Sequence, residues 1–206
     1  MAAQSSRLIF AWLGIFLLVL AWSAWQPHDY VTWWLEVLPA LLALVILAAT
    51  RTRFPLTALA YWLILAHCIV LMVGGHYTYA EVPLGDWLME MTGGQRNNYD
   101  KLGHFMQGFV PAIVAREILI RNQVLARRGW LSLFVVSICL AFSAFYELVE
   151  WWVALLSSEA AESFLGTQGY VWDTQSDMFL ALAGAVIALL TLGRIHDRQI
   201  SELDKP

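Results

Sequence analysis

The stretch WLSLFVVSICLAFSAFYELVEWWVALL, Trp130 to Leu156, determines how this chain must fold. It exceeds the roughly 20 apolar residues that carry an α-helix across about 30 Å of hydrocarbon. Its only charged residues are Glu147 and Glu150. Since backbone groups in lipid must be hydrogen-bonded internally, the stretch is predicted to be a transmembrane helix. Two acids near the end of a membrane span also raise a question of function.

The composition extends this prediction to the whole chain. The sequence has 206 residues and is 60% hydrophobic, whereas soluble domains are about 45 to 50% apolar. Cys68 and Cys139 both lie in apolar runs and form no CxxC pattern, so neither a disulfide framework nor a cysteine metal site is indicated. No basic tract with interleaved aromatic residues suggests a nucleic-acid partner.

Six apolar runs are long enough to span a membrane. The sequence therefore predicts an all-α, polytopic membrane protein, a bundle of six transmembrane helices forming a single domain over residues 1–206. Pro39 and Pro111 fall inside predicted spans, where they are expected to kink the helix. The predicted spans are residues 8–25, 31–50, 54–76, 102–121, 130–156 and 174–193.

The basic residues give the predicted orientation. On one side of the membrane lie Arg7, Arg51, Arg53, Arg121, Arg127, Arg128, Arg194, Arg198 and Lys205. Only Arg96 and Lys101 fall on the other side. By the positive-inside rule, both termini are expected to be cytoplasmic.

Acidic residues and a histidine gather at one predicted depth, near the outer face. They are Glu36, Asp100, His104, Glu147, Glu150, Asp173 and Asp177. Within a span, the spacing of Asp100 and His104, of Glu147 and Glu150, and of Asp173 and Asp177 places each pair on one face of its helix. Arg96 and Lys101 supply too little positive charge for so many acids, so protons, metal ions or a cationic ligand are expected to compensate the remaining acids.

Simpler explanations exist for some of these residues. Asp173 has the character of a helix N-cap, and Asp100 would be favoured by the positive end of its helix dipole. Glu147 and Glu150 have no such explanation, because they lie toward the negative, C-terminal end of their helix. Elsewhere, Arg116 and Glu117 are expected at the cytoplasmic interface, and the small residues of ALAGA (181–185) are expected to let two helices approach closely.

A divalent metal ion is the cation that best suits this residue set. Paired carboxylates and imidazoles on facing helices form the di-metal sites of helical bundles. The candidate ligands are Asp100, His104, Glu147, Glu150, Asp173 and Asp177, with His76 as a further candidate. Oxygen ligands with one or two nitrogens favour zinc, manganese or iron over magnesium or calcium.

Several motifs resemble those of a known family. HYTYAEVP, YDKLGHFMQGF, YELVEWW and GTQGYVWDTQSDM resemble the YjdF-like family of bacterial inner-membrane proteins over nearly the whole chain. This resemblance implies an inner-membrane location and a six-helix architecture more than a reaction. More distantly, the DKxxHF order is similar to VanZ-like membrane proteins associated with glycopeptide resistance, although YELVEWW departs from their pattern. That likeness selects Asp100, Lys101, His104, Glu147 and Asp177.

The leading functional hypothesis is a metal-dependent membrane enzyme that acts on a membrane lipid or a lipid-linked envelope precursor. Glu147 or Glu150 would be the base, and Lys101, Arg96 and Glu36 would contact the substrate. One alternative is a small transporter or ion-binding protein that uses the same acids. Another is a structural or regulatory membrane subunit in which the acids bind only a stabilising cation.

Overall fold

The computed structural model describes residues 2–156 and 170–203, and every regular element within these ranges is helical. The chain divides into two compact units. The first comprises Met1–Arg51 and Trp62–Asp100, and the second comprises Thr52–Tyr61 and Lys101–Pro206. Each unit is therefore described by itself.

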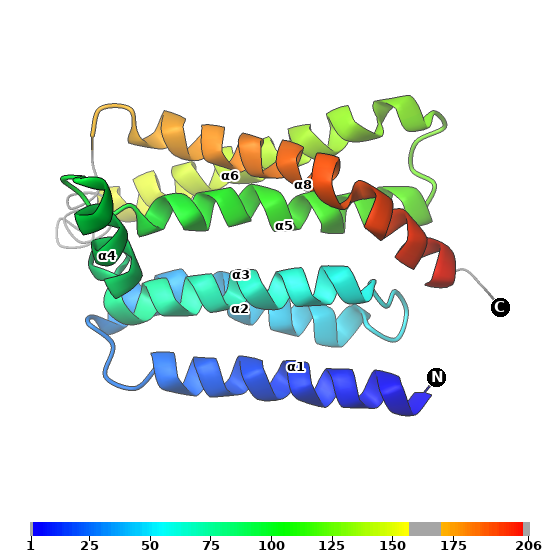
Figure 1. Ribbon diagram of the computed structural model, residues 1–206, viewed down its shortest axis with the longest axis horizontal. Helices are drawn as coiled ribbons and strands as arrows, with labels where there is room; N and C mark the ends of the chain where they lie inside the picture. Colours follow the sequence, from blue (N-terminus) through cyan, green and yellow to red (C-terminus); the bar gives the residue numbers. More distant parts are fainter. Residues whose placement is uncertain (1, 157–169, 204–206) are drawn as a thin grey trace. The chain divides into compact units, whose positions relative to one another are not determined.

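The first unit contains three long helices and two short ones (Figure 1). They are α1 (Ala2–Ser23), α2 (Tyr30–Thr50), α3 (Ala58–Tyr77), η1 (Tyr79–Glu81) and α4 (Pro83–Thr92). α2 begins at a sequence-coded cap, since Asp29 Oδ2 accepts a hydrogen bond from the Thr32 amide at 2.6 Å. This bond holds the pKa of Asp29 below its ordinary value. α4 has the sequence PLGDWLMEMT and begins with Pro83.

The second unit is built on three long helices, α5 (Tyr99–Arg121), α6 (Leu131–Leu156) and α8 (Asp173–Leu203), with the short η2 (Arg128–Trp130) before α6. α6 packs along α8 (Figure 1). α8 runs ten residues past its predicted end at 193, and its 31 residues span about 46 Å. This length exceeds the hydrocarbon thickness of about 30 Å, so part of α8 must leave the apolar layer.

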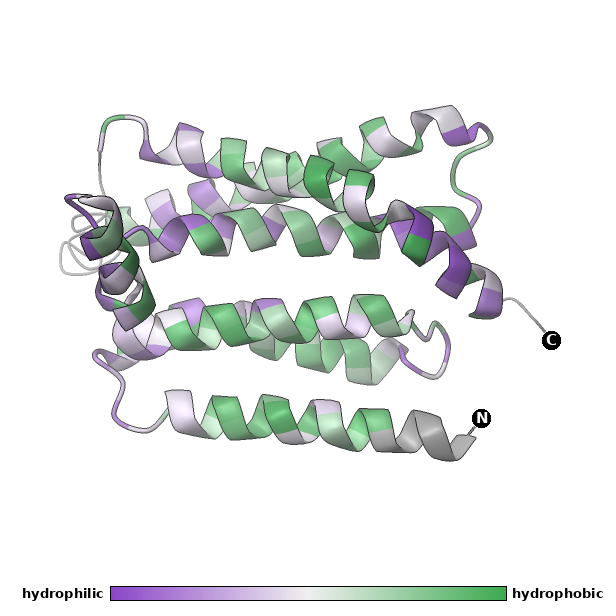
Figure 2. Cartoon of the chain, viewed as in Figure 1, coloured by the Kyte–Doolittle hydropathy of each residue, from purple (hydrophilic) through white to green (hydrophobic). Residues whose placement is uncertain are grey.

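Membrane-spanning character is clear for part of the predicted set. Four segments are long and apolar enough to cross a bilayer, namely Tyr30–Thr50, Ala58–Tyr77, Arg128–Leu156 and Asp173–Leu203, and Leu8–Ser23 is a shorter apolar helix. α5 is helical over its predicted span but carries charged residues near both ends. Figure 2 shows apolar residues along the middle of the long helices and polar residues at many of their ends.

α5 and α8 approach each other at backbone distance. A Cβ atom added to Gly108 would overlap the carbonyl oxygen of Ala181, and one added to Gly184 would overlap that of Phe105. The close approach predicted for ALAGA is thereby confirmed. Small residues at such crossings let two helices pack through their backbones, which gains dispersion contacts where lipid gives no hydrophobic driving force.

A buried polar network ties α5 to α8 and to the segment before α3. The carboxylate of Glu117 accepts hydrogen bonds from the Thr57 amide at 2.9 Å, from Arg121 Nη1 at 2.9 Å and from His196 Nε2 at 3.0 Å. His196 Nδ1 in turn lies 3.2 Å from Arg116 Nη1. Both Glu117 and His196 are fully buried. Every member of this network therefore has partners.

The network also removes two charged side chains from contact with solvent. Arg116 and Glu117 are 8% and 0% exposed. Arg116 Nη2 donates a 2.7 Å hydrogen bond to Asp197, which lies in the part of α8 beyond the predicted span. The extension of α8 supplies the partners that make burial of these charges tolerable.

The Gly184 contact predicts that alanine substitutions at two glycines of α8 will change the free energy of unfolding differently. Gly184→Ala should lower the free energy of unfolding by about 1 to 3 kcal/mol, because the new methyl group has no room. Gly193→Ala should be neutral or stabilising by up to about 1 kcal/mol, because nothing lies within 4 Å of its added Cβ and alanine favours helix. Thermal unfolding in detergent measures both, and equal effects would contradict the packing described.

Candidate metal centre

Three ligand-type side chains from three helices of the second unit converge. They are His104 of α5, Glu147 of α6 and Asp177 of α8, and each offers one ligand atom within 4.8 Å of the others. His104 Nδ1 lies 3.8 Å from Glu147 Oε1, and His104 Nε2 lies 3.8 Å from Asp177 Oδ2. Their side chains are 10%, 8% and 6% exposed in that order. We call this set the triad.

The α5–α8 crossing explains how two members of the triad meet. His104 is one helical turn before Gly108, and Asp177 is one turn before Ala181. Because Gly108 contacts Ala181 directly, the residues one turn earlier on each helix are also held close together. On α6, the buried residues Val135, Cys139 and Ser143 follow one another at intervals of four residues. Glu147, the third member of the triad, occupies the next position of this stripe.

Gln107 orients the imidazole. Its Oε1 lies 3.2 Å from His104 Nδ1 and accepts a hydrogen bond in the tautomer protonated at Nδ1. That tautomer leaves the Nε2 lone pair directed toward Asp177. A ligating histidine is commonly held in this way, through a hydrogen bond from its other ring nitrogen. In that tautomer, Gln107 would hold His104 with Nε2 available as a metal ligand.

Several polar atoms in and near the triad lack the hydrogen-bond partners that Glu117 has. Among the described residues, Glu147 Oε1, Ser143 Oγ and Asp100 Oδ1 are buried without a hydrogen-bond partner. Glu117, by contrast, accepts bonds from Thr57, Arg121 and His196. A buried polar atom without a partner costs about 1 to 3 kcal/mol, and more if it is charged. The triad thus has ligand capacity that the protein itself does not use.

The triad has the donor set of a transition-metal site. One imidazole and two carboxylates suit zinc, manganese or iron. The triad's three ligand atoms lie within 4.8 Å of one another, so the residues that would hold such an ion are already gathered.

The other predicted ligands of the outer layer lie near the triad along their helices but are not members of it. Asp100 is one turn before His104 in α5, is 3% exposed, and forms a 2.8 Å ion pair with Arg96. Asp173 is the first residue of α8, one turn before Asp177, and is half-buried. Glu150 follows Glu147 along α6 and is also half-buried.

The remaining predicted site residues have other surroundings. His76 and Glu36 belong to the first unit. His76 Nδ1 lies 3.1 Å from the carbonyl oxygen of Ser23, and its ring contacts Trp22. Glu36 is 8% exposed and lies against Gly75. In the second unit, the ammonium group of Lys101 lies 5.0 Å from the centre of the Tyr170 ring.

Two residues of the centre were not predicted from the sequence. Gln107 lies three residues after His104, and Ser143 lies four residues before Glu147. Both spacings place a residue on the same helix face as the ligand. The helical spacing therefore indicated a position beside a ligand for each residue. Uncharged polar residues are common in membrane spans, however, so this spacing did not identify them as site residues.

Comparisons with known proteins agree on one family. Residues 8–198 match the family described as predicted membrane protein DUF2238. The chain is also 52% identical over 183 residues to the inner membrane protein YjdF of Escherichia coli (strain K12), which covers 89% of this chain and 88% of that protein. No solved structure matches. Together with its apolar helices, these matches place the chain among the multi-pass proteins of the bacterial inner membrane, and it belongs to the DUF2238 family of predicted membrane proteins.

Proposed function

We propose that His104, Glu147 and Asp177 bind a divalent metal ion near the outer face of the inner membrane. We further propose that the ion supports chemistry on a membrane lipid or a lipid-linked envelope precursor. The observation that carries the proposal is the buried Glu147 Oε1, which has no hydrogen-bond partner among the described residues, although His104 and Asp177 lie close by. An ionised acid near the bilayer centre costs about 2.5 to 3.5 kcal/mol on insertion scales, and a bound cation would offset much of that cost.

The chemistry follows from the donor set. A bound divalent ion acts as a Lewis acid and lowers the pKa of a coordinated water to about 7. Glu150, half-buried and three residues after Glu147, would accept the proton of the attacking group. Lys101, in the same unit as the triad, would bind a phosphate or carboxylate of the substrate.

The proposed membrane arrangement has six spans and both termini in the cytoplasm. It rests on the asymmetry of the basic residues, most of which lie on the side of the α5–α6 connection. In this arrangement α5 is a span despite its charges, because Arg116 and Glu117 have buried partners. The triad then lies in the outer third of the membrane.

One observation favours the alternative of a metal or proton carrier. The inner halves of α5 and α8 hold further buried ionisable groups, Glu117 and His196, on the helices that bear His104 and Asp177. Two features weigh against a carrier. The backbone contact of Gly108 with Ala181 lies between these clusters, and the inner groups are engaged with one another. We therefore favour a centre that works from the outer side.

Metal content tests the site directly. The purified wild-type protein should contain about one divalent ion per chain, and Glu147→Gln or Asp177→Asn should reduce that content at least tenfold, because each removes a charged ligand. Elemental analysis by mass spectrometry measures the content. Glu90→Gln is the matched control, since Glu90 is an exposed acid of α4. Wild-type protein that stays metal-free and normally stable after incubation with zinc, manganese and iron would refute the site.

The enzymatic part has its own test. Metal-loaded wild-type protein, incubated with an inner-membrane lipid extract, should generate a new product detectable by mass spectrometry. Glu150→Gln should slow its formation by about 10² to 10⁴-fold while metal content is retained, because only the proton acceptor is lost. Release of metal from loaded proteoliposomes without any product would instead identify a carrier.

The arrangement in the membrane is tested by labelling single cysteines. In a background carrying Cys68→Ala and Cys139→Ala, Gln95→Cys should react with a membrane-impermeant maleimide on intact spheroplasts. Gln123→Cys should react only after permeabilisation. Gln95 and Gln123 are both exposed, so access to the reagent depends on the side of the membrane. The reverse labelling pattern would overturn the orientation.

A further inference from the structure

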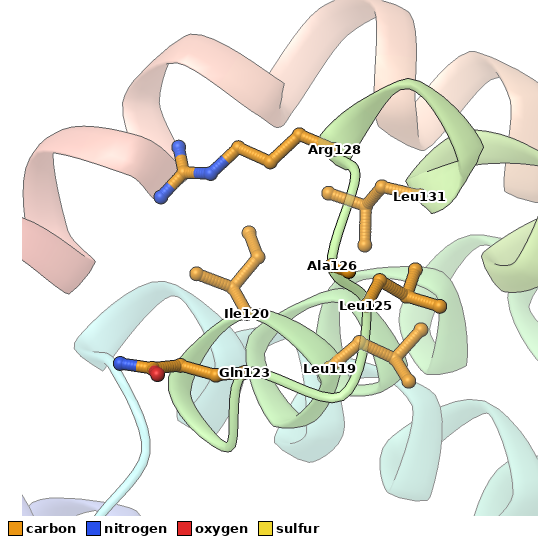
Figure 3. Close-up of a pocket in the computed structure, with 7 residues that line it drawn as sticks. All are labelled: Leu119, Ile120, Gln123, Leu125, Ala126, Arg128 and Leu131. Carbon is orange, nitrogen blue, oxygen red and sulfur yellow. The ribbon is translucent and has the colours of Figure 1, made fainter.

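A cavity of about 380 Å³ lies at the connection between α5 and α6, at the end of α5 opposite the triad (Figure 3). Its lining combines apolar side chains with a cation and an amide, and contains no acid. The lining residues are Leu119, Ile120, Gln123, Leu125, Ala126, Arg128 and Leu131. Its volume is within the range of about 300 to 1,000 Å³ that is typical of small-molecule sites.

The local backbone opens this cavity. Gln123 adopts a left-handed conformation with a φ of 52°, and the amides of Gln123 and Val124 bond back to the carbonyls of Ile120 and Leu119. This is the hydrogen-bonding arrangement of a tight helix end, and it turns the chain sharply away from α5. The connection then passes over the end of α5, leaving apolar side chains on both sides of a gap. Figure 3 shows Arg128 extending across that gap above Ile120.

The basic residues at this end of α5 fall into two groups. Arg116 and Arg121 are engaged, with Asp197 and with Glu117 respectively. Arg127 and Arg128 are exposed, and no ion pair joins either to another described residue. They adjoin Trp130, which is 56% exposed and is the type of residue that anchors a helix at the membrane interface. This end of α5 therefore presents positive charge beside a cavity that is lined by both apolar and polar groups.

We propose that this cavity binds the head group of an anionic phospholipid. The phosphate would lie at Arg127 and Arg128, and the upper acyl chain would fill the space between Ile120 and Leu131. Basic pockets between transmembrane helices on the cytoplasmic side are suited to anionic head groups, and juxtamembrane arginines attract them. The lining suits a lipid, because its apolar side chains would contact the acyl chain while its polar atoms, including Arg128, would contact the phosphate. This proposal is independent of the metal centre.

Two exposed arginines away from the cavity should not bind the phospholipid as Arg127 and Arg128 do. The chain contains such a pair, which serves as a matched control. Arg51 and Arg53 are exposed arginines in the turn after α2, predicted to face the same side of the membrane. Removing them subtracts the same charge as removing Arg127 and Arg128. A site that depends on the cavity will distinguish the two pairs, whereas a general attraction to an anionic membrane will not.

The experiment uses the whole protein in nanodiscs of equal phosphatidylglycerol and phosphatidylcholine, followed by native mass spectrometry of the released protein. Wild-type protein should retain phosphatidylglycerol in preference to phosphatidylcholine. Arg127→Gln with Arg128→Gln should reduce that preference about 10- to 30-fold, and Arg51→Gln with Arg53→Gln should leave it nearly unchanged. Ala126→Trp, which keeps the charges and fills the cavity, should also abolish retention.

Three results would overturn the proposal. One is equal loss of retention in both pairs of arginine variants, which would indicate diffuse attraction. Another is equal retention of the two lipids by the wild-type protein. The third is displacement of phosphatidylglycerol by millimolar inorganic phosphate, which would indicate a site for a soluble anion. Size-exclusion profiles of the variants separate each result from misfolding.

Discussion

The backbone contact between α5 and α8 is the constraint on which the rest of the second unit depends. Gly108 and Gly184 leave no space for a Cβ atom, so the two helices can meet only in one register. That register places His104 and Asp177 at the same level, one and two turns away from the glycines. It also sets the positions of Glu117 and His196 at the far ends of the contact. A side chain at either glycine would therefore separate polar groups at both ends of the helix pair.

The buried carboxylates of Glu117, on α5, and of Glu147, on α6, differ in their hydrogen bonding. Glu117 carries a negative charge surrounded by donors from Thr57, Arg121 and His196, which is how a charge is stabilised away from water. Glu147 has no comparable donors at Oε1, and Ser143 Oγ, one turn earlier, also has no partner among the described residues. The same chain thus satisfies one buried acid fully and leaves another with spare acceptor capacity. This contrast favours a structural role for the residues around Glu117 and ligand binding by the triad.

The sequence predicted the long helices well but not where each of them ends. Hydropathy located the long helices because lipid requires uninterrupted apolar runs, but it placed the end of α8 at 193, where apolarity stops. The helix continues because His196 and Gln199 find partners in Glu117 and in the Leu59 amide. These partners lie far away in the chain, so no local pattern reveals them.

Selection of the triad from the wider set of acids also depended on packing. The helical period paired Glu147 with Glu150, and both were equally good candidates by spacing. Only the buried stripe of Val135, Cys139 and Ser143 distinguishes them, because its repeat continues to Glu147. Similarly, His76 and Glu36 were grouped with the other residues by predicted depth alone. Membrane depth gives the position of a side chain along one direction only. A metal site needs its ligands to lie close in all three directions, and the packing of the helices determines the other two.

The two ends of the α5–α8 pair are held by different means, and this difference bears on how a ligand would act. At the Glu117 end, α8 is fixed by direct bonds from Arg116 to Asp197 and from His196 to Glu117. At the triad end, the contacts of His104 with Glu147 and Asp177 are 3.8 Å long, beyond ordinary hydrogen-bond distance. A cation bound there would join α5, α6 and α8. Because such an ion binds only the assembled helices, its binding energy would contribute directly to the stability of the triad end.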